Sequence, residues 1–270
     1  YSSIILKSGA DSIRVVAQQN GVVMYADVPE SYALSDDGDD ISFTVTSNRD
    51  VKVKSSSAWI RCVASGRNVT VTVRKNDEGH VRTGWFAYSS GNVADTVKVS
   101  QASVADLYGN YRLMGYSSNN SLVYLPASIS AGEAENELLV TCTPQGNSWQ
   151  FKAMFDPQTH KVVVANGNDT GMWAVQGINF HIFLCMLSSR NNTFNWDSGL
   201  SCELGIEYDE TTRTTRMDLL PFAYDNGAGE TVFDSWVFAA FQNVDPETGL
   251  PKGAASAYPA ILYTPYFQSL

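Results

Sequence analysis

The sequence predicts an all-β protein: an immunoglobulin-like β-sandwich followed by a larger antiparallel β-barrel or sandwich. Three observations support this. Apolar residues alternate with polar ones through most of the chain, as in strands that turn one face to water. Clusters of Gly, Asn, Asp and Pro separate these runs and are typical of tight turns. The balance of charge changes near Ser103, which predicts a boundary between residues 22–102 and 103–270.

The start of the chain repeats a motif that occurs again about one sandwich length later. Residues 10–15 read Ala-Asp-Ser-Ile-Arg-Val, and residues 94–99 read Ala-Asp-Thr-Val-Lys-Val. Each stretch follows a Ser-Gly turn and runs on to a glutamine, which is Gln18 or Gln19 in the first copy and Gln101 in the second. The offset of 84 residues fits one small sandwich of roughly 100 residues or fewer. We therefore expect residues 1–21 to form a terminal hairpin that resembles the end of a preceding copy.

Residues 22–102 carry the alternation of a sandwich. Ile41, Phe43 and Val45 alternate with serine and threonine, and 69–73 and 97–99 repeat this pattern with valine. Sandwiches commonly bury a large aromatic residue between their sheets, so Trp59 is expected in the core.

Residues 103–270 continue the alternation in longer strands with short links. About ten such strands fit an antiparallel barrel or a large sandwich, and a barrel leaves no exposed edges. A helix is expected only at 253–258, where Pro259 would end it. The expected strands lie at 108–117, 121–126, 137–143, 148–156, 160–166, 171–176, 178–188, 193–197, 200–208, 214–221, 230–242 and 259–268.

The strand expected at 178–188 is the most apolar segment of the chain. Apolar side chains on both of its faces indicate a strand buried on both sides, or one that lines a lumen open to an apolar ligand. Cys185 and Cys202 lie in neighbouring expected strands. They are expected to be buried free thiols, or a disulfide in an oxidising compartment.

The uneven charge narrows the class of partner. Residues 1–102 carry 11 basic and 11 acidic residues, whereas 103–270 carry 7 and 17, so the net charge of −10 lies in the second domain. An acidic half repels phosphate and no basic stripe is present, which argues against nucleic acid. No apolar run reaches the roughly 18 residues of a membrane-spanning helix.

Residues 28–102 resemble a BACON domain, the Bacteroidetes-associated carbohydrate-binding often N-terminal module. The resemblance rests on the order and spacing of seven motifs. It departs where that family often has a tryptophan soon after the Ser-Asn pair, because Val51 and Val53 stand here. The seven motifs are Ser47-Asn48, Ala58-Trp59-Ile60, Val69–Val73, Lys75-Asn76, Arg82-Thr83-Gly84, the turn Ser90-Gly91 and Thr96–Gln101. The resemblance implies an immunoglobulin-like sandwich that binds carbohydrate or serves as a spacer.

Residues 106–270 resemble the lipocalin-like C-terminal domains of exported Bacteroidetes lipoproteins. The similarity rests on Leu107-Tyr108-Gly109-Asn110-Tyr111 and on the rhythm of hairpins. It implies an exported protein of the periplasm or outer-membrane surface, held at the membrane only through a lipid anchor outside this chain. It implies no site residues.

Candidate ligand-binding residues lie where an aromatic stands beside an amide or a carboxylate. Trp173 follows an Asn-rich turn that contains Asn168, and Asn195, Trp196 and Asp197 are consecutive. Sugar rings stack their C–H faces on aromatic rings, and their hydroxyls bind amides and carboxylates. The alternative for both tryptophans is partial burial at a strand end.

Catalytic and metal-binding patterns are weak. A glycosidase needs two carboxylates roughly 5–10 Å apart, and Asp197, Glu203, Glu207 and Asp234 offer pairs without forcing such a distance. Residues 36–40 read Asp-Asp-Gly-Asp-Asp but lack the ligand series of a calcium loop. We expect no metal, no cofactor and no catalysis. The sequence favours an exported, non-catalytic protein that binds or adheres to a polysaccharide or glycoprotein glycan. The alternatives are a structural or protein-interaction module of a surface lipoprotein complex, or a glycoside hydrolase.

Overall fold

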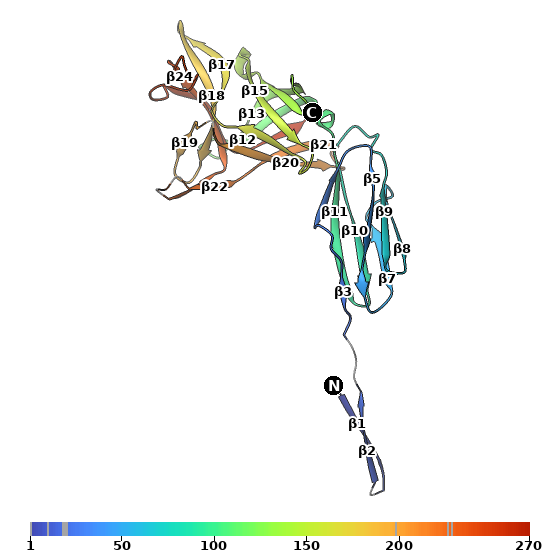
Figure 1. Cartoon of the computed structure of the whole chain (residues 1–270). Coiled ribbons are helices and arrows are strands. Elements are labelled where there is room, and N and C mark those ends of the chain that lie inside the picture. Colours follow the sequence, from blue (N-terminus) through green and yellow to red (C-terminus); the bar gives the residue numbers. More distant parts are fainter. Residues whose placement is uncertain (1, 10, 18–20, 198, 226, 228) are drawn as a thin grey trace. The chain divides into compact units, whose positions relative to one another are not determined.

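A computed structural model describes residues 2–9, 11–17, 21–197, 199–225, 227 and 229–270 (Figure 1). Strands dominate, and the described helices are two short 3-10 turns, η1 (Val104–Leu107) and η2 (Pro144–Gly146). The expected all-β class, with a sandwich and a barrel, is confirmed. Among the described residues, no helix has the length and apolar character needed to cross a membrane.

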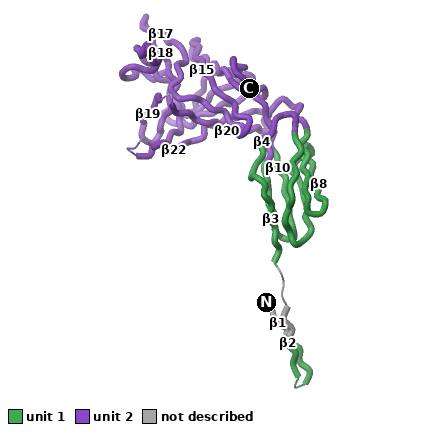
Figure 2. Tube along the Cα trace, in the orientation of Figure 1, with its two compact units in different colours: residues 1–32, 39–74, 84–98 green, residues 33–38, 75–83, 99–270 purple. Residues whose placement is uncertain are grey.

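The chain divides into two compact units (Figure 2). Unit 1 comprises Tyr1–Tyr32, Asp39–Arg74 and Gly84–Lys98. Unit 2 comprises Ala33–Gly38, Lys75–Thr83 and Val99–Leu270. Three stretches that precede the expected boundary at Ser103, residues 33–38, 75–83 and 99–102, therefore belong to the second unit.

Unit 1 begins with a hairpin of β1 (Ser2–Ser8) and β2 (Asp11–Ala17). Ser8 pairs with Asp11 across the turn, where Gly9 has a φ of 64°. Leu6 and Ile13 are cross-strand partners, and their side chains are 59% and 67% exposed. Of the residues in the expected repeat, Ala10, Gln18 and Gln19 lie outside the described residues. The hairpin's relation to a preceding sandwich stays a prediction.

The remaining strands of unit 1 build the sandwich. One sheet has the order β4-β11-β10-β7, a second has the order β5-β9-β8, and β3 pairs with β6. The strands are β3 (Met24–Tyr25), β4 (Ser31–Leu34), β5 (Asp39–Thr44), β6 (Thr46–Ser47), β7 (Val51–Ser55), β8 (Ile60–Ser65), β9 (Asn68–Val73), β10 (Arg82–Ser90) and β11 (Val93–Gln101).

The sandwich core follows the alternation in the sequence. Val69, Val71 and Val73 are buried on one face of β9, and Phe86 is buried on β10. Trp59 differs from its expected role, because it lies in the turn before β8 and is only half-buried, while the next residue, Ile60, fills the core.

Unit 2 is centred on a closed antiparallel barrel of eight strands, with further strands attached to its last strand. The barrel order is β12-β13-β14-β15-β16-β20-β21-β25, and β25 returns to β12. Its strands are β12 (Gly109–Tyr116), β13 (Leu122–Ala131), β14 (Glu137–Cys142), β15 (Trp149–Asp156), β16 (Lys161–Ala165), β20 (Ser201–Asp209), β21 (Thr214–Leu220) and β25 (Ala257–Ser269). The attached strands are β17 (Asn168–Val175), β18 (Ile178–Ser188), β19 (Thr193–Asn195) and β24 (Ser235–Phe241), and β22 (Phe222–Asp225) pairs with β23 (Glu230–Phe233).

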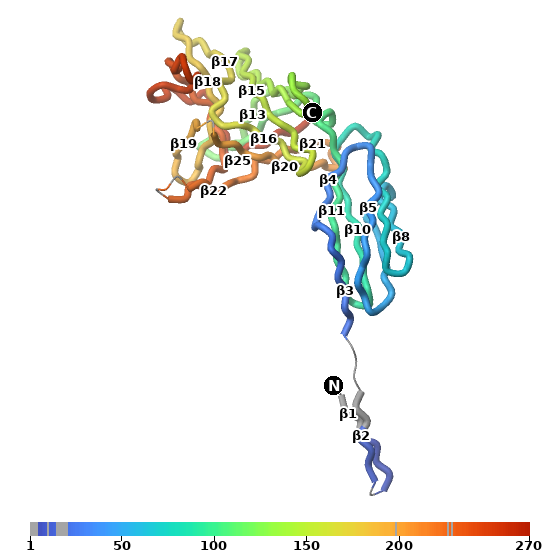
Figure 3. Tube along the Cα trace, viewed as in Figure 1, coloured from blue at the N-terminus to red at the C-terminus, as the bar shows by residue number. Residues whose placement is uncertain are grey.

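The long strand β25 closes the barrel and also carries its extension (Figure 3). Its first half pairs with β24, and its second half pairs with both β12 and β21. The switch falls near Thr264, which has a φ of 45°. Opposite it, a Cβ on Gly115 would lie 2.9 Å from Cβ of Leu262, so this close approach of two strands requires glycine.

The barrel is filled with side chains. Trp149, Phe151, Trp236 and Phe267 are all buried in one continuous core. The expected burial on both faces is observed for residues 182–188 but not for 178–181, which are exposed or half-buried. Leu184 and its alternate neighbours face this core, while the intervening side chains join a smaller outer cluster. The outer cluster comprises Phe183, Cys185, Leu187, Val237, Ala239 and Phe241.

Several local expectations for residues 103–270 were wrong. The expected helix at 253–258 is absent: Gly253 has a φ of 85°, and Ser256 donates its N–H to the Ala240 carbonyl beside β24. The strand expected at 121–126 continues through Pro126 to Ala131. The strand expected at 230–242 is divided at Asp234 into β23 and β24.

The cysteines are free thiols. Cys185 belongs to the outer cluster, whereas Cys202 belongs to the barrel core, so a disulfide between them is not formed. Burial raises the pKa of both thiols to about 12, which leaves them protonated and unreactive at neutral pH.

His160 gives unit 2 a pH dependence. It is buried, its ring stacks on Phe155, its Nδ1 lies 2.8 Å from Oγ of Ser100, and its Nε2 has no hydrogen-bond partner among the described residues. Burial lowers its pKa below the ordinary 6.5, although Asp36 and Asp156 act in the opposite direction. His160 therefore binds a proton less readily in the folded protein than in the unfolded chain.

We expect the free energy of unfolding to fall as the pH drops below about 6.5, and to level off below the pKa of the folded state. Urea unfolding at several pH values between about 5 and 8 measures this. His160→Phe is the control, since it keeps an aromatic ring against Phe155 and cannot titrate. Equal pH slopes in the wild type and the variant would contradict the expectation.

Candidate functional site

A cavity of about 360 Å³ in unit 2 combines aromatic rings with amide groups. We call it the Trp173 cavity. It is lined by Tyr124, Leu125, Pro126, Pro144, Gln145, Asn147, Trp149, Trp173 and Pro259. These residues come from β13, the η2 turn, the start of β15, β17 and the start of β25.

The η2 turn supplies the amides because its backbone is locally constrained. Pro144 begins the turn, and Gln145 and Gly146 have φ values of 48° and 82°. The Asn147 N–H donates to the Pro144 carbonyl at 2.9 Å, and its side-chain Nδ2 reaches the same oxygen at 3.3 Å. The turn therefore places Gln145, which is exposed, and Asn147 between two barrel strands.

Two tryptophans differ in burial within this cavity. Trp149 is 1% exposed and stacks on Phe238 with ring centroids 5.1 Å apart. Its Nε1 is buried without a hydrogen-bond partner among the described residues. Trp173 is half-buried, lies 6.0 Å from the Phe180 ring and packs against the barrel core. The cavity thus offers the partly open ring of Trp173 above a buried tryptophan.

Among the described residues, those that line the Trp173 cavity carry no charge. The guanidinium of Arg112 lies 5.2 Å from the centre of the Tyr124 ring. An uncharged lining in a strongly acidic unit favours a ligand recognised by stacking and neutral hydrogen bonds.

A second cavity of about 390 Å³, the Trp196 cavity, is lined by Asn195, Trp196, Asp197 and Leu250. Oδ1 of Asn195 accepts the Asp197 N–H at 2.5 Å, and Oδ1 of Asp197 accepts the Gly199 N–H at 2.9 Å. Trp196 is half-buried and packs edge-on against Phe241 at 5.8 Å. These contacts fix the loop and leave part of the indole open.

The structure distributes the sequence-predicted site residues between these cavities. Asn195, Trp196 and Asp197 line one together, and Trp173 lines the other. Asn168 lines neither, because its Nδ2 donates to the Ala165 carbonyl across a turn. Sequence reasoning missed Tyr124, Gln145, Asn147 and Trp149. The run Pro-Gln-Gly-Asn at 144–147, just before Trp149, shows the same pattern of aromatic beside amide.

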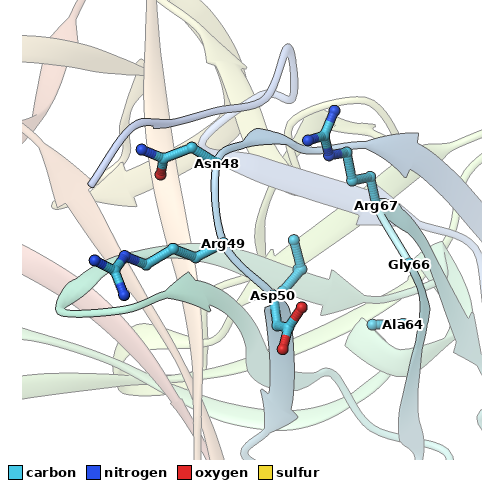
Figure 4. Close-up of a pocket in the computed structure, with 7 residues that line it drawn as sticks. Asn48, Arg49, Asp50, Ala64, Gly66 and Arg67 are labelled. Atoms are coloured by element: carbon cyan, nitrogen blue, oxygen red, sulfur yellow. The ribbon is translucent and has the colours of Figure 1, made fainter. Parts of the chain in front are cut away.

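Unit 1 has a cavity of about 450 Å³ at the turns around Asn48 and Gly66 (Figure 4). The Asn48 side chain is engaged there, accepting the Val23 N–H at 3.1 Å and donating to the Gly21 carbonyl at 2.8 Å. The side chains of Arg49 and Arg67 extend in different directions, Arg49 to the left and Arg67 upward in Figure 4. None of the described residues that line this cavity is aromatic, so they offer no stacking surface for a sugar.

The acidic residues considered for catalysis have separate partners. Glu203 pairs with Lys161 at 2.6 Å, and Asp234 accepts hydrogen bonds from Ser189 and Ser235. Only Asp197 of the four candidate acids lines a cavity described above. No group of three or more His, Cys, Asp or Glu side chains in the described part of the chain is placed to hold a metal ion.

Comparisons with known proteins do not assign the chain to a family. No protein-family model matches the chain. No curated protein matches it. Among solved structures, it is similar to a Bacteroides ovatus GH5 xyloglucanase in complex with a XXXG heptasaccharide, with a TM-score of 0.27 and 16% identity. The match covers 30% of this chain and 19% of that one, so the chain spans about a fifth of the xyloglucanase.

Proposed function

We propose that this protein binds carbohydrate without catalysis, at the Trp173 cavity. One observation carries the proposal: a half-buried tryptophan, an exposed tyrosine and two amides line a single cavity. An aromatic ring stacks on the C–H face of a sugar, and amides bind its hydroxyls.

The size and charge of the cavity support this proposal. Its 360 Å³ falls within the roughly 300–1,000 Å³ of small-molecule sites. Hydrolysis of a glycoside needs two carboxylates across the scissile bond, and none lines this cavity.

The rest of the chain is suited to presenting the ligand site. We propose that the sandwich, which resembles a BACON domain, is a spacer, and that the lipocalin-like barrel carries the ligand site at the surface of an exported protein. A protein-interaction module is the second candidate. It is favoured by the exposed apolar side chains of Leu6 and Ile13 on the terminal hairpin.

Trp173→Ala tests the binding site. We expect the variant to bind at least about tenfold more weakly than the wild type, because an aromatic anchor contributes more than about 1.4 kcal/mol. Affinity electrophoresis in gels with mixed-linkage β-glucan, xylan, galactomannan or polygalacturonate measures binding. Trp85→Ala is the matched control, since Trp85 is a half-buried tryptophan of unit 1.

Two outcomes count against the proposal. Wild-type protein that no polysaccharide retards would contradict carbohydrate binding. Equal retardation of the Trp173→Ala variant and the wild type would place binding elsewhere on the chain.

A further inference from the structure

The two cavities of unit 2 lie on opposite faces of one sheet. Trp149, which lines the Trp173 cavity, stacks on Phe238 of β24, whereas Trp196 packs against Phe241 of the same strand. Phe238 belongs to the barrel core and Phe241 to the outer cluster. Side chains three positions apart in a strand point to opposite faces of its sheet. The sheet therefore separates a short ligand in one cavity from the other cavity.

The loop that carries Trp196 is held in place by a buried amide. Asn166 is 3% exposed, and its Oδ1 accepts the N–H of Met186 in β18 at 2.8 Å. Its Nδ2 donates to the Asp197 carbonyl at 3.0 Å and to Oδ1 of Asn195 at 3.3 Å. One buried side chain thus ties the residues on both sides of the indole to the neighbouring strand, and such a satisfied buried network rigidifies what it connects.

The Trp196 backbone also packs closely against the residue that follows Asn166. This residue, Gly167, has a φ of 68°, and a Cβ there would collide with the Trp196 carbonyl oxygen, so the position requires glycine. The indole ring lies 5.4 Å from the Phe194 ring and 5.8 Å from the Phe241 ring. Because these contacts fix the indole in the absence of a ligand, little conformational entropy is lost when a ligand binds.

Two polar groups beside the indole are free to bind a ligand. Oδ1 of Asp197 accepts the Gly199 N–H, and Oδ1 of Asn195 accepts N–H groups from Asn166 and Asp197. Within the described part of the chain, Oδ2 of Asp197 accepts no hydrogen bond and Nδ2 of Asn195 donates none. A sugar with two adjacent hydroxyls matches this acceptor and donor, since each hydroxyl both donates and accepts.

We propose that the Trp196 cavity is a second saccharide site, so that unit 2 is bivalent for a neutral polysaccharide. A sugar unit stacks on the indole and binds Asn195 and Asp197 through adjacent hydroxyls. The volume of about 390 Å³ lies within the range of small-molecule sites, and the Asp197 carboxylate repels an anionic sugar. Bivalence rests on the proposed function at the Trp173 cavity, whereas the second site depends only on the contacts around Trp196.

Sites on opposite faces give the protein a property that neither site has alone. Each protein molecule holds two polysaccharide chains at once, and each chain, with its many repeated units, holds many protein molecules. Such a mixture forms a cross-linked network, and attachment at one site raises the effective concentration of polymer at the other.

Calorimetric titration with a short oligosaccharide counts the sites. The probes are the tetrasaccharides of β-glucan, xylan and galactomannan. We expect two molecules of a bound probe per wild-type chain, and one per chain in Trp173→Ala and in Trp196→Ala. Light scattering of the wild type mixed with the parent polymer should rise as the network forms, and neither single variant should produce this rise.

Asp197→Asn tests the second site with little disturbance of the fold, because Asp197 is exposed and asparagine keeps an oxygen for the Gly199 N–H. The substitution replaces the free acceptor by a donor, so we expect affinity at the second site to fall about tenfold while the Trp173 cavity is unaffected. Trp85→Ala, at a half-buried tryptophan of unit 1, is the matched control and should retain both sites. Thermal unfolding of each variant verifies that the fold is retained.

The possible outcomes distinguish the second site from the function proposed for the first. One bound probe per wild-type chain, unchanged in Trp196→Ala, overturns the second site and leaves binding at the Trp173 cavity intact. One bound probe that only Trp196→Ala abolishes overturns bivalence and the proposed function of the Trp173 cavity. Tighter binding of galacturonate oligosaccharides than of the neutral probes overturns the neutral class. Absence of binding by the wild type to every probe and polymer overturns both proposals.

Discussion

Replacing Trp236 by alanine is expected to lower the free energy of unfolding of unit 2 by about 3–5 kcal/mol. The side chain is 1% exposed near the start of β24. Its ring meets Phe151 of β15 edge-on at 6.2 Å and lies 6.1 Å from Phe267 of β25, so it joins β24 to two strands of the barrel. The substitution removes this burial and leaves a cavity that the closed barrel cannot collapse to fill.

Urea unfolding followed by far-UV circular dichroism measures the loss. Trp173→Ala is the comparison, because Trp173 is half-buried and its removal leaves a gap that water can enter. A loss below about 1 kcal/mol for Trp236→Ala would mean that the barrel interior is not packed as described.

Replacing Gln101 by leucine is expected to cost about 3 kcal/mol, because it removes one of the acceptors of the buried Arg82 cation, which also donates to the Lys75 carbonyl. Arg82 is 5% exposed and donates from Nε and Nη2 to Oε1 of Gln101, at 2.9 and 2.7 Å. Gln101 is itself fully buried, and its Nε2 donates to the Ser35 carbonyl at 3.0 Å. Burial lowers the pKa of Arg82, consistent with a charge that depends on these contacts.

Gln101→Glu is the matched control. It keeps an oxygen for Arg82 and adds a compensating charge, but it loses the bond to Ser35 and turns a second carboxylate oxygen toward that carbonyl. We expect it to be less destabilising than Gln101→Leu in thermal and urea unfolding. Equal losses for the two variants would show that the acceptor on Gln101 does not stabilise Arg82.

Local patterns carried most of the fold prediction. The strand expected at 178–188 has the same bounds in the structure, because its apolar run is long and clearly bounded. Alternation also placed Val69–Val73 correctly, since each side chain that faces a core is apolar. The alternation of apolar and polar residues shows which face of a strand is buried, so this face can be predicted without knowing which strands pair.

Contacts between residues far apart in the sequence could not be predicted from such local patterns. Pro126 looked like a strand end, but β13 continues because its neighbours β12 and β14 pair along its length. The Trp173 cavity draws residues from five separated elements, and its amides depend on the left-handed backbone of Gln145. Barrel closure brings these together, and no sequence window of ordinary length contains them.

The double role of β25 sets the order of events during synthesis. Strand β12 begins at Gly109, whereas β25, which pairs with it, ends at Ser269. One edge of β12 therefore stays unpaired while most of the unit is translated. Contacts between such distant residues demand much loop-closure entropy and slow the search for the native state. The completed ring, and with it any ligand site at the start of β25, therefore matures only once that final strand has left the ribosome.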